Sequence, residues 1–218
     1  MINNLITPMN FTLVQASICE LLAKERDKQE EIAFEKGFSE EYIHQNIDFT
    51  IYPKRFRIPD VQYMPCVFVY FDNLDFPTGE QSPSNNYALA NLNVDYFCCG
   101  KAELCRDDSE NFFSISADDN AEDRLNYLTA QIYKILFSEQ NYRKNTCLVD
   151  HVKPKQWQRI MAPNELNQAA TVLGASFTCE LGFNEPTILN DTIKIKELYI
   201  NLDIRDEFLS PLIRKNFT

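Results

Sequence analysis

The sequence predicts an α+β protein, a mainly antiparallel sheet with long hairpins flanked by two amphipathic helices. Alternating, β-rich runs recur between turn-forming segments, which is typical of paired strands. Two other stretches carry apolar residues at helical spacing. With 218 residues, 44% of them hydrophobic, the chain can bury one core. We therefore predict a single domain over 1–218, with loop insertions near 73–86 and 100–118 and a short C-terminal tail.

The N-terminal part is predicted to form a helix that lies on the sheet. Asn10 or Thr12 can cap it, and its single apolar stripe ends near Gly37. Residues 46–52 are expected to form a short strand. The basic segment KRFR at 54–57 is either a solvated turn or a contact with an acidic neighbour.

The next two strands are predicted to form an antiparallel hairpin. Pro65 precedes the apolar run CVFVYF, whose length and composition indicate a buried strand. Turn-forming residues fill 73–86, so we expect a long exposed loop there. The segment YALANLNVDYFCC at 87–99 predicts the partner strand, because one side carries Ala88, Ala90, Leu92, Val94, Tyr96 and Cys98 and the other carries Tyr87, Leu89, Asn91, Asn93, Asp95 and Phe97.

The second amphipathic helix has the clearest pattern in the chain. Ser116 or Asp118 can cap it, acidic residues in its first turn suit the helix dipole, and it ends near Ser138. This helix is predicted to pack on the same sheet as the first.

The remaining strands are predicted to form a long hairpin from Gln168 to Ile204. The segment KQWQRIMA at 155–162 is expected to pair with it. Neither arm shows one cleanly apolar face, which predicts a sheet covered partly by its own helices and partly by other subunits. The last residues, 206–217, allow a short helix broken by Pro211.

The overall charge and the motifs exclude several classes of protein. A formal charge of −11 disfavours wrapping of nucleic acid. No apolar run approaches the roughly 20 residues of a membrane helix, and the N-terminus lacks the pattern of a secretion signal. Synthesis as a soluble cytoplasmic protein is the expectation. Neither GxGxxG nor GxxxxGK[ST] occurs, so no nucleotide loop is predicted.

Few residues are arranged as a catalytic or metal site. The chain has two histidines, His44 and His151, and no GxSxG motif, so a Ser–His–Asp triad is not predicted. Cys147 and His151 remain a possible thiol–imidazole pair. Cys98, Cys99, Cys105, Cys147 and His151 contain enough ligands for zinc but no CxxC pair. We predict no enzyme activity and no cofactor, and keep a Cys/His metal protein or enzyme as the alternative.

Charged segments of opposite sign predict contacts between subunits. An acidic stretch includes Asp107, Asp108, Asp118 and Asp119. Such a stretch is more often a solvated loop than a metal site, and we favour the solvated loop. A basic stretch surrounds Trp157, and it fits an acidic protein surface better than a nucleic acid. Opposed charges on one chain suit head-to-tail contact between identical copies. The basic residues expected in such contacts are Arg143, Lys144, Lys153, Lys155, Arg159, Lys194 and Lys196.

The order of elements resembles that of tail-terminator or neck proteins of tailed bacteriophages. A leading helix is followed by PCVFVYF, a long strand, the helix beginning AEDRLNYLTAQIYKIL and a C-terminal strand hairpin. The resemblance is one of pattern over most of the chain. The segment 73–86, the acidic stretch and the C-terminal tail depart from compact members of that family.

The resemblance implies a structural virion protein in the neck of the tail, assembled in the host cytoplasm. Six copies would form a ring that caps the tail tube and joins it to the head connector or stopper protein, with the sheath as a further partner in a contractile tail. Genomic DNA would pass through the lumen without sequence-specific binding. The alternative within the virion is another neck or tube-associated protein, which would polymerise as open stacks if it were a tube protein.

Overall fold

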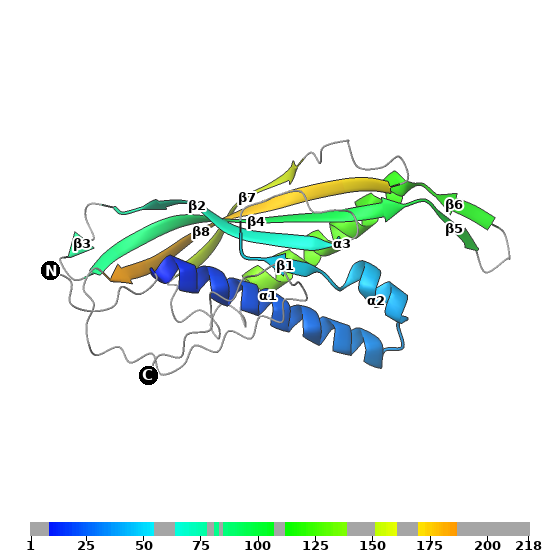
Figure 1. Ribbon diagram of the computed structural model, residues 1–218, viewed down its shortest axis with the longest axis horizontal. Helices are drawn as coiled ribbons and strands as arrows, with labels where there is room; N and C mark the ends of the chain where they lie inside the picture. Colours follow the sequence, from blue (N-terminus) through cyan, green and yellow to red (C-terminus); the bar gives the residue numbers. More distant parts are fainter. Residues whose placement is uncertain are drawn as a thin grey trace.

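The computed structural model describes residues 9–54, 64–77, 81–82, 85–106, 112–138, 151–160 and 170–186. Their order is two helices, six strands, one helix and two strands, and the α+β class predicted from the sequence is confirmed. Long strands run along the length of the molecule and helices pack beside them (Figure 1). The helices are α1 (Asn10–Glu35), α2 (Glu40–Asn46) and α3 (Ala117–Phe137).

The main sheet has the strand order β1-β2-β4-β8-β7, and β3 pairs with β4 beside this path. Every pairing is antiparallel except that of β1 with β2, which is parallel. The two central strands, β4 and β8, pair over their whole length. The strands of this sheet are β1 (Thr50–Tyr52), β2 (Cys66–Asp75), β3 (Gln81–Ser82), β4 (Asn85–Lys101), β7 (His151–Ile160) and β8 (Ala170–Pro186).

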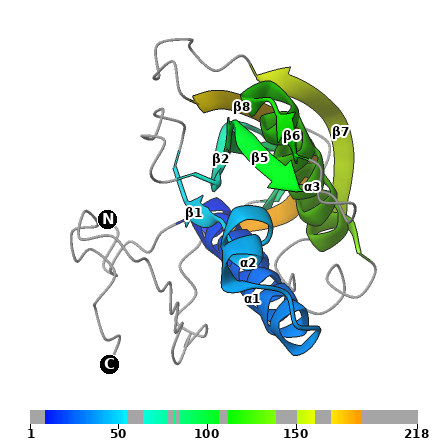
Figure 2. The ribbon, with the colours of Figure 1, turned by 90° about the vertical axis from the view of Figure 1, so that its right-hand side faces the viewer.

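One face of the sheet packs against α1 and α3 to form the core. Alternation along β4 sends Leu92, Val94 and Tyr96 to this face, where they meet Leu125 and Ile132 of α3. In the end-on view of Figure 2, strands β2, β8 and β7 curve around α3. The opposite face of β4 has no helix over it among the described residues. The apolar set predicted for one side of this strand is therefore the set that is buried under the helices.

The strand β8 corrects the expectation of mixed faces in the first arm of the long hairpin. Its residues from Leu173 to Phe183 that face the helices are all apolar, and those on the other face include Gly174, Ser176 and Thr178. The strand therefore has one apolar face, and this alternation becomes clear when the residues beyond Phe177 are included. The second arm of the hairpin and the C-terminal tail lie outside the described residues.

The start of α1 is held by a distant carboxylate, and the predicted cap is wrong. The N-cap residue is Met9, which makes no side-chain cap. Instead Glu185 of β8 accepts hydrogen bonds from the backbone N–H groups of Asn10 at 2.7 Å and Phe11 at 3.2 Å. Thr12 is exposed. The helix ends near Gly37, as predicted, with that glycine at φ 81°.

The segment between α1 and β2 differs from the prediction. Residues 40–46 form helix α2, and only Thr50–Tyr52 of the expected strand 46–52 is extended. The hydroxyl of Ser39 caps α2 by accepting a hydrogen bond from the Tyr42 N–H at 3.1 Å. This cap was not predicted from the sequence. Of the basic segment 54–57, only Lys54 is described.

The loops predicted near 73–86 and 100–118 are shorter than expected. β2 continues to Asp75, β3 occupies 81–82 and β4 begins at Asn85. Residues 103–106 and 112–115 form a separate two-stranded sheet, β5 (Glu103–Arg106) and β6 (Phe112–Ile115). These strands lie where the acidic composition predicted a loop, and the short segments ELCR and FFSI pair with each other in an antiparallel register.

The predicted second amphipathic helix is confirmed at both ends. The hydroxyl of Ser116 accepts from the Asp119 N–H at 3.1 Å, and Ser138 follows the last helical residue. The close approach of α3 to β4 depends on Gly100, since a Cβ there would lie 2.2 Å from the backbone N of Ala121. This contact places the start of α3 directly on the sheet.

Candidate functional site: the open face of the sheet

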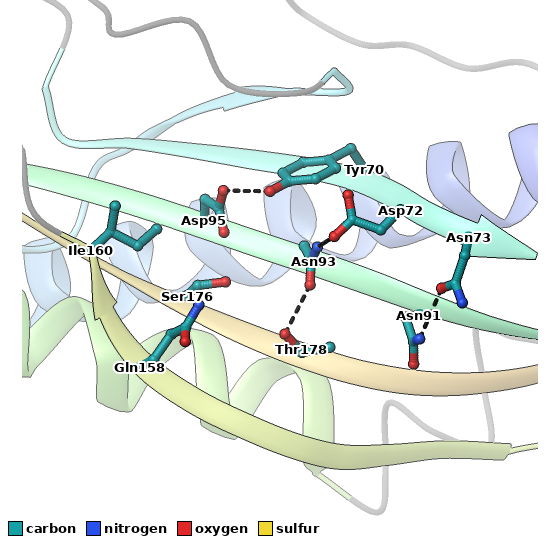
Figure 3. Close-up of a pocket in the computed structure, with 10 residues that line it drawn as sticks. All are labelled: Tyr70, Asp72, Asn73, Asn91, Asn93, Asp95, Gln158, Ile160, Ser176 and Thr178. Carbon is teal, nitrogen blue, oxygen red and sulfur yellow. Dashed lines mark hydrogen bonds between the residues drawn. The ribbon is translucent and has the colours of Figure 1, made fainter.

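A polar groove of about 540 Å³ lies on the sheet face opposite the helices. Strands β2, β4, β8 and β7 all contribute to it, and their side chains converge in Figure 3. The alternation that buries Leu92 and Val94 on one face sends Asn91, Asn93 and Asp95 to this one. The groove is therefore a direct product of the period-2 pattern in β4.

Hydrogen bonds run across the strands that line the groove. The Tyr70 hydroxyl donates to the Asp95 carboxylate at 2.7 Å. Asn93 donates to Asp72 through its side-chain nitrogen, and its oxygen accepts from the Thr178 hydroxyl at 2.8 Å. These bonds join β2, β4 and β8 in one polar ladder (Figure 3). Such cross-strand pairs hold side chains in fixed positions and favour a rigid surface.

A second set of polar contacts extends the ladder along β4 to Asn91. Asn91 donates to the Asn73 side-chain oxygen at 2.8 Å. The Lys155 ammonium of β7 donates to the Asn91 side-chain oxygen at 3.2 Å. The groove thus carries two carboxylates, Asp72 and Asp95, with one cation at its side, and its chemistry suits hydrogen-bond donors of a partner.

The lining residues of this groove include hydroxyl and carboxylate side chains but no histidine or cysteine. Ser176 is buried, and its register partners are Asp95 of β4 and Gln158 of β7. Tyr70 and Asp95 form a hydroxyl–carboxylate pair. Among the described residues, no group of three His, Cys, Asp or Glu side chains that could hold a metal ion lies beside this pair.

Four of the predicted contact residues lie together on β7, the last strand in the described sheet order. Lys153, Lys155, Trp157 and Arg159 are all exposed on this strand. Arg159 forms a salt bridge with Glu122 of α3, and this partner raises the pKa of its guanidinium. The Trp157 indole N–H donates to the Tyr96 hydroxyl at 2.8 Å.

The other predicted contact residues are not gathered at this strand. Asp118 and Asp119 lie in the first turn of α3, where Asp118 accepts from the Thr171 hydroxyl and Asp119 accepts from the Ser116 hydroxyl at 2.7 Å. They therefore have local structural roles. Outside the described residues lie Asp107, Asp108, Arg143, Lys144, Lys194 and Lys196.

The cysteines that are described do not assemble as a metal site. Cys98 and Cys99 alternate across β4, and burial raises the pKa of the Cys98 thiol to about 12. The Cys98 thiol donates to the Ala121 carbonyl at 3.3 Å. Cys105 lies apart on β5, and Cys147 is outside the described residues. Within the part of the chain that the structure covers, no three His, Cys, Asp or Glu side chains converge on one point.

The groove itself was missed by reasoning from the sequence. The alternating Asn91, Asn93 and Asp95 were visible as one side of a strand, but their neighbours on β2 and β8 depend on the register of pairing. Asn93 lies opposite Tyr70 on one side and Thr178 on the other. A search for polar residues at alternate positions in several strands could have indicated a polar sheet face. It could not have shown which residues of neighbouring strands lie opposite one another.

Comparison with known proteins gives no identification. No protein-family model matches the chain, and no curated protein matches its sequence. Among the helices that the structure describes, none has the length and apolar character needed to cross a lipid bilayer.

Proposed function

We propose that this chain is a structural virion protein of a tailed bacteriophage, a tail terminator that forms a ring. The ring caps the tail tube and joins it to the head connector. The proposal starts from the resemblance in element order, in which α1, β2, β4, α3 and β8 correspond to the segments that carry it; the full described order is two helices, six strands, a helix and two strands.

The observation that supports ring formation most is the character of β7. This strand ends the described sheet order and carries exposed Lys153, Lys155, Trp157 and Arg159. Lysines, a proline and a register irregularity at Pro154/Gln156 disfavour backbone pairing at this outer strand, so contact with another copy would use the exposed side chains of β7. The chain has a formal charge of −11, so a local basic strand favours an acidic surface of the next copy.

The groove adds a second surface suited to assembly. Its side chains already satisfy one another across three strands, so it is rigid before a partner binds. A rigid polar face with two carboxylates also repels a phosphate backbone, which suits a protein whose ring lets DNA pass.

Native mass spectrometry and negative-stain electron microscopy of the purified protein test the proposal. A hexamer of the 25.4 kDa chain has a mass of about 150 kDa and should image as closed rings. Added to the polymerising tube protein of the same genome, the rings should bind tube ends and stop growth.

Three other outcomes would each contradict the terminator function. Open stacks of the protein alone would favour a tube protein. Rings that leave tube ends free would favour another neck component. A monomer that retains stoichiometric zinc after dialysis would favour the Cys/His alternative, and metal analysis of the same sample measures this directly.

A further inference from the structure

One buried carboxylate on the open face of the sheet has no cation beside it. Asp95 of β4 is 5% exposed, and one of its oxygens accepts from the Tyr70 hydroxyl at 2.7 Å. Among the described residues, no lysine, arginine or histidine forms an ion pair with Asp95, and its other oxygen has no hydrogen-bond donor. A buried charge is costly unless it is paired, so a cation bound at this position would stabilise the carboxylate.

A buried hydroxyl without a partner lies next to this carboxylate. Ser176 of β8 is 3% exposed and is the register partner of Asp95. Its side chain lines the groove, and no hydrogen bond joins it to another described residue (Figure 3). Buried hydroxyls are normally hydrogen-bonded, so a free hydroxyl at the floor of a groove is available to a ligand.

Apolar side chains lie at one end of the groove, beside these two residues. Phe97 is the next residue of β4 on this face after Asp95, and it is buried together with Phe68. Ile160 of β7 packs against this pair and also lines the groove. A ligand that reaches the buried carboxylate therefore meets hydrogen-bonding groups at the floor and apolar groups at one end, a combination that small-molecule sites share.

The free groups match an organic cation with N–H donors. The second oxygen of Asp95 and the hydroxyl of Ser176 can both accept hydrogen bonds. The two donors beside the carboxylates are already used, because Tyr70 donates to Asp95 and Asn93 donates to Asp72. A primary ammonium or a guanidinium group supplies both the missing charge and the missing donors. A hard metal ion fits less well, since no three His, Cys, Asp or Glu side chains gather among the described residues.

Charges at the side of the groove favour a small molecule over a basic protein surface. Lys155 of β7 donates to Asn91 in the groove lining, and Lys153 is the register partner of Glu180 on the same face. Both lysines are exposed, so they repel a basic protein surface. Lys155 does not neutralise Asp95, because Asn91 and Asp95 are four residues apart, about 13 Å along β4.

We propose that this groove binds a small organic molecule that carries a primary ammonium or a guanidinium group. The cation donates to Asp95 and to the Ser176 hydroxyl, and the rest of the molecule lies beside Ile160. The groove volume of about 540 Å³ is within the range of small-molecule sites, about 300–1,000 Å³. All the lining residues come from one chain, so the site does not require the proposed ring.

Saturation-transfer NMR of the intact protein with ethylguanidinium chloride, at constant ionic strength, tests the site. This probe carries the charge and the N–H donors, with an ethyl group for the apolar end. Two matched probes separate these features. Tetramethylammonium has the charge without N–H donors, and N-ethylurea has N–H donors without the charge. We expect saturable binding of ethylguanidinium and at least about tenfold weaker binding of the other two probes.

Two variants and a matched control locate the binding. Asp95→Asn keeps an oxygen for the Tyr70 hydroxyl but removes the charge, and it should weaken ethylguanidinium binding at least about tenfold. Ser176→Ala removes one hydrogen bond and should weaken it about threefold. Asp123→Asn changes the net charge equally at an exposed position of α3, on the other side of the sheet, and should bind as the unmodified chain does.

The controls separate loss of binding from loss of fold. Circular dichroism should show that all three variants remain folded, and if Asp95→Asn unfolds, Ser176→Ala and the three probes decide. The inference is overturned by absent or non-saturable binding of ethylguanidinium, by equal binding of the three probes, or by equal affinities of Asp95→Asn and Asp123→Asn. Binding of the peptide acetyl-Gly-Arg-Gly-amide at least about tenfold more tightly than ethylguanidinium would also overturn it, because the groove would then belong to an arginine side chain of a partner protein.

The outcome for this site is distinct from the outcome for the proposed function. Native mass spectrometry of the same samples measures the oligomeric state. Rings that do not bind ethylguanidinium contradict the cation site and leave the terminator proposal intact. A monomer that binds the probe through Asp95 supports the site and contradicts the ring.

Discussion

Glu185 should stabilise the fold through the start of a helix that is 175 residues away in the sequence. Its carboxylate is 5% exposed and accepts from the backbone N–H groups of Asn10 and Phe11. These are two of the four N–H groups that a helix leaves without an internal partner. Replacement by alanine removes both acceptors and the negative charge at the positive end of the helix dipole.

The magnitude follows from the contacts that are lost. Removal of an N-cap acceptor costs about 0.5–2 kcal/mol, and a partly buried charge at a helix end contributes up to about 2 kcal/mol. The two contributions describe the same pair of hydrogen bonds, so they do not add in full. We expect Glu185→Ala to lower the free energy of unfolding by about 2 kcal/mol. Glu185→Gln keeps one acceptor and the shape, and it should lose about 1 kcal/mol.

Urea titration followed by circular dichroism measures the loss directly. For a chain of this size, 2 kcal/mol corresponds to a fall in Tm of about 4–8 °C. If the protein is a ring, all variants must be compared at one protein concentration, because assembly adds to apparent stability. The order expected is unmodified chain, Glu185→Gln, then Glu185→Ala.

The matched control is the residue that local sequence rules favour as the cap. Thr12 is exposed and lies inside the helix, so Thr12→Ala should change the free energy of unfolding by less than about 0.5 kcal/mol. The reasoning is refuted if Thr12→Ala costs more than Glu185→Ala, or if Glu185→Ala leaves stability unchanged.

Two further predictions concern packing and ionisation. Gly100→Ala should lower the free energy of unfolding, measured by urea titration, by about 3 kcal/mol, because its Cβ would lie 2.2 Å from the Ala121 backbone N. Gly37→Ala should lower it by about 1 kcal/mol, because this position lies in open space but has a φ of 81°. Burial raises the pKa of the Cys98 thiol from 9.0 to about 12, so the unfolded state loses this proton first as pH rises. Stability should therefore fall between about pH 9 and pH 12, and Cys98→Ala should reduce that slope by up to about 1.4 kcal/mol per pH unit. A slope equal to that of the unmodified chain would contradict the assignment. In the same samples Cys105→Ser should remove one equivalent of fast reaction with a thiol reagent.

The parts of the fold that were predictable have strong local patterns. The helix from Ser116 to Ser138 combines a cap, acidic residues in the first turn and a continuous apolar stripe. The strand from Tyr87 to Cys99 carries an unbroken apolar set at alternate positions from Ala88 to Cys98, so both its existence and its buried face were predictable. In these segments short-range preference and tertiary packing favour the same structure.

The parts that were not predictable depend on neighbours distant in sequence. The bonds that build the groove join Tyr70, Asn93 and Thr178 from three strands, and only the register brings them together. One residue of slip would send Asn93 into the core, so the site depends on pairing rather than on any one strand.

The sequence by itself determined the α+β class, the apolar face of β4 and the extent of α3, because each depends on periodicity within one segment. Only the tertiary structure decided that Glu185 caps α1, that Asn93 and Asp95 share a groove with β2 and β8, and that the hairpin 103–115 stands clear of the sheet. These features arise from contacts between segments far apart in the chain. Their geometry is fixed by sheet register and by the packing of helices on one face, which no local pattern encodes.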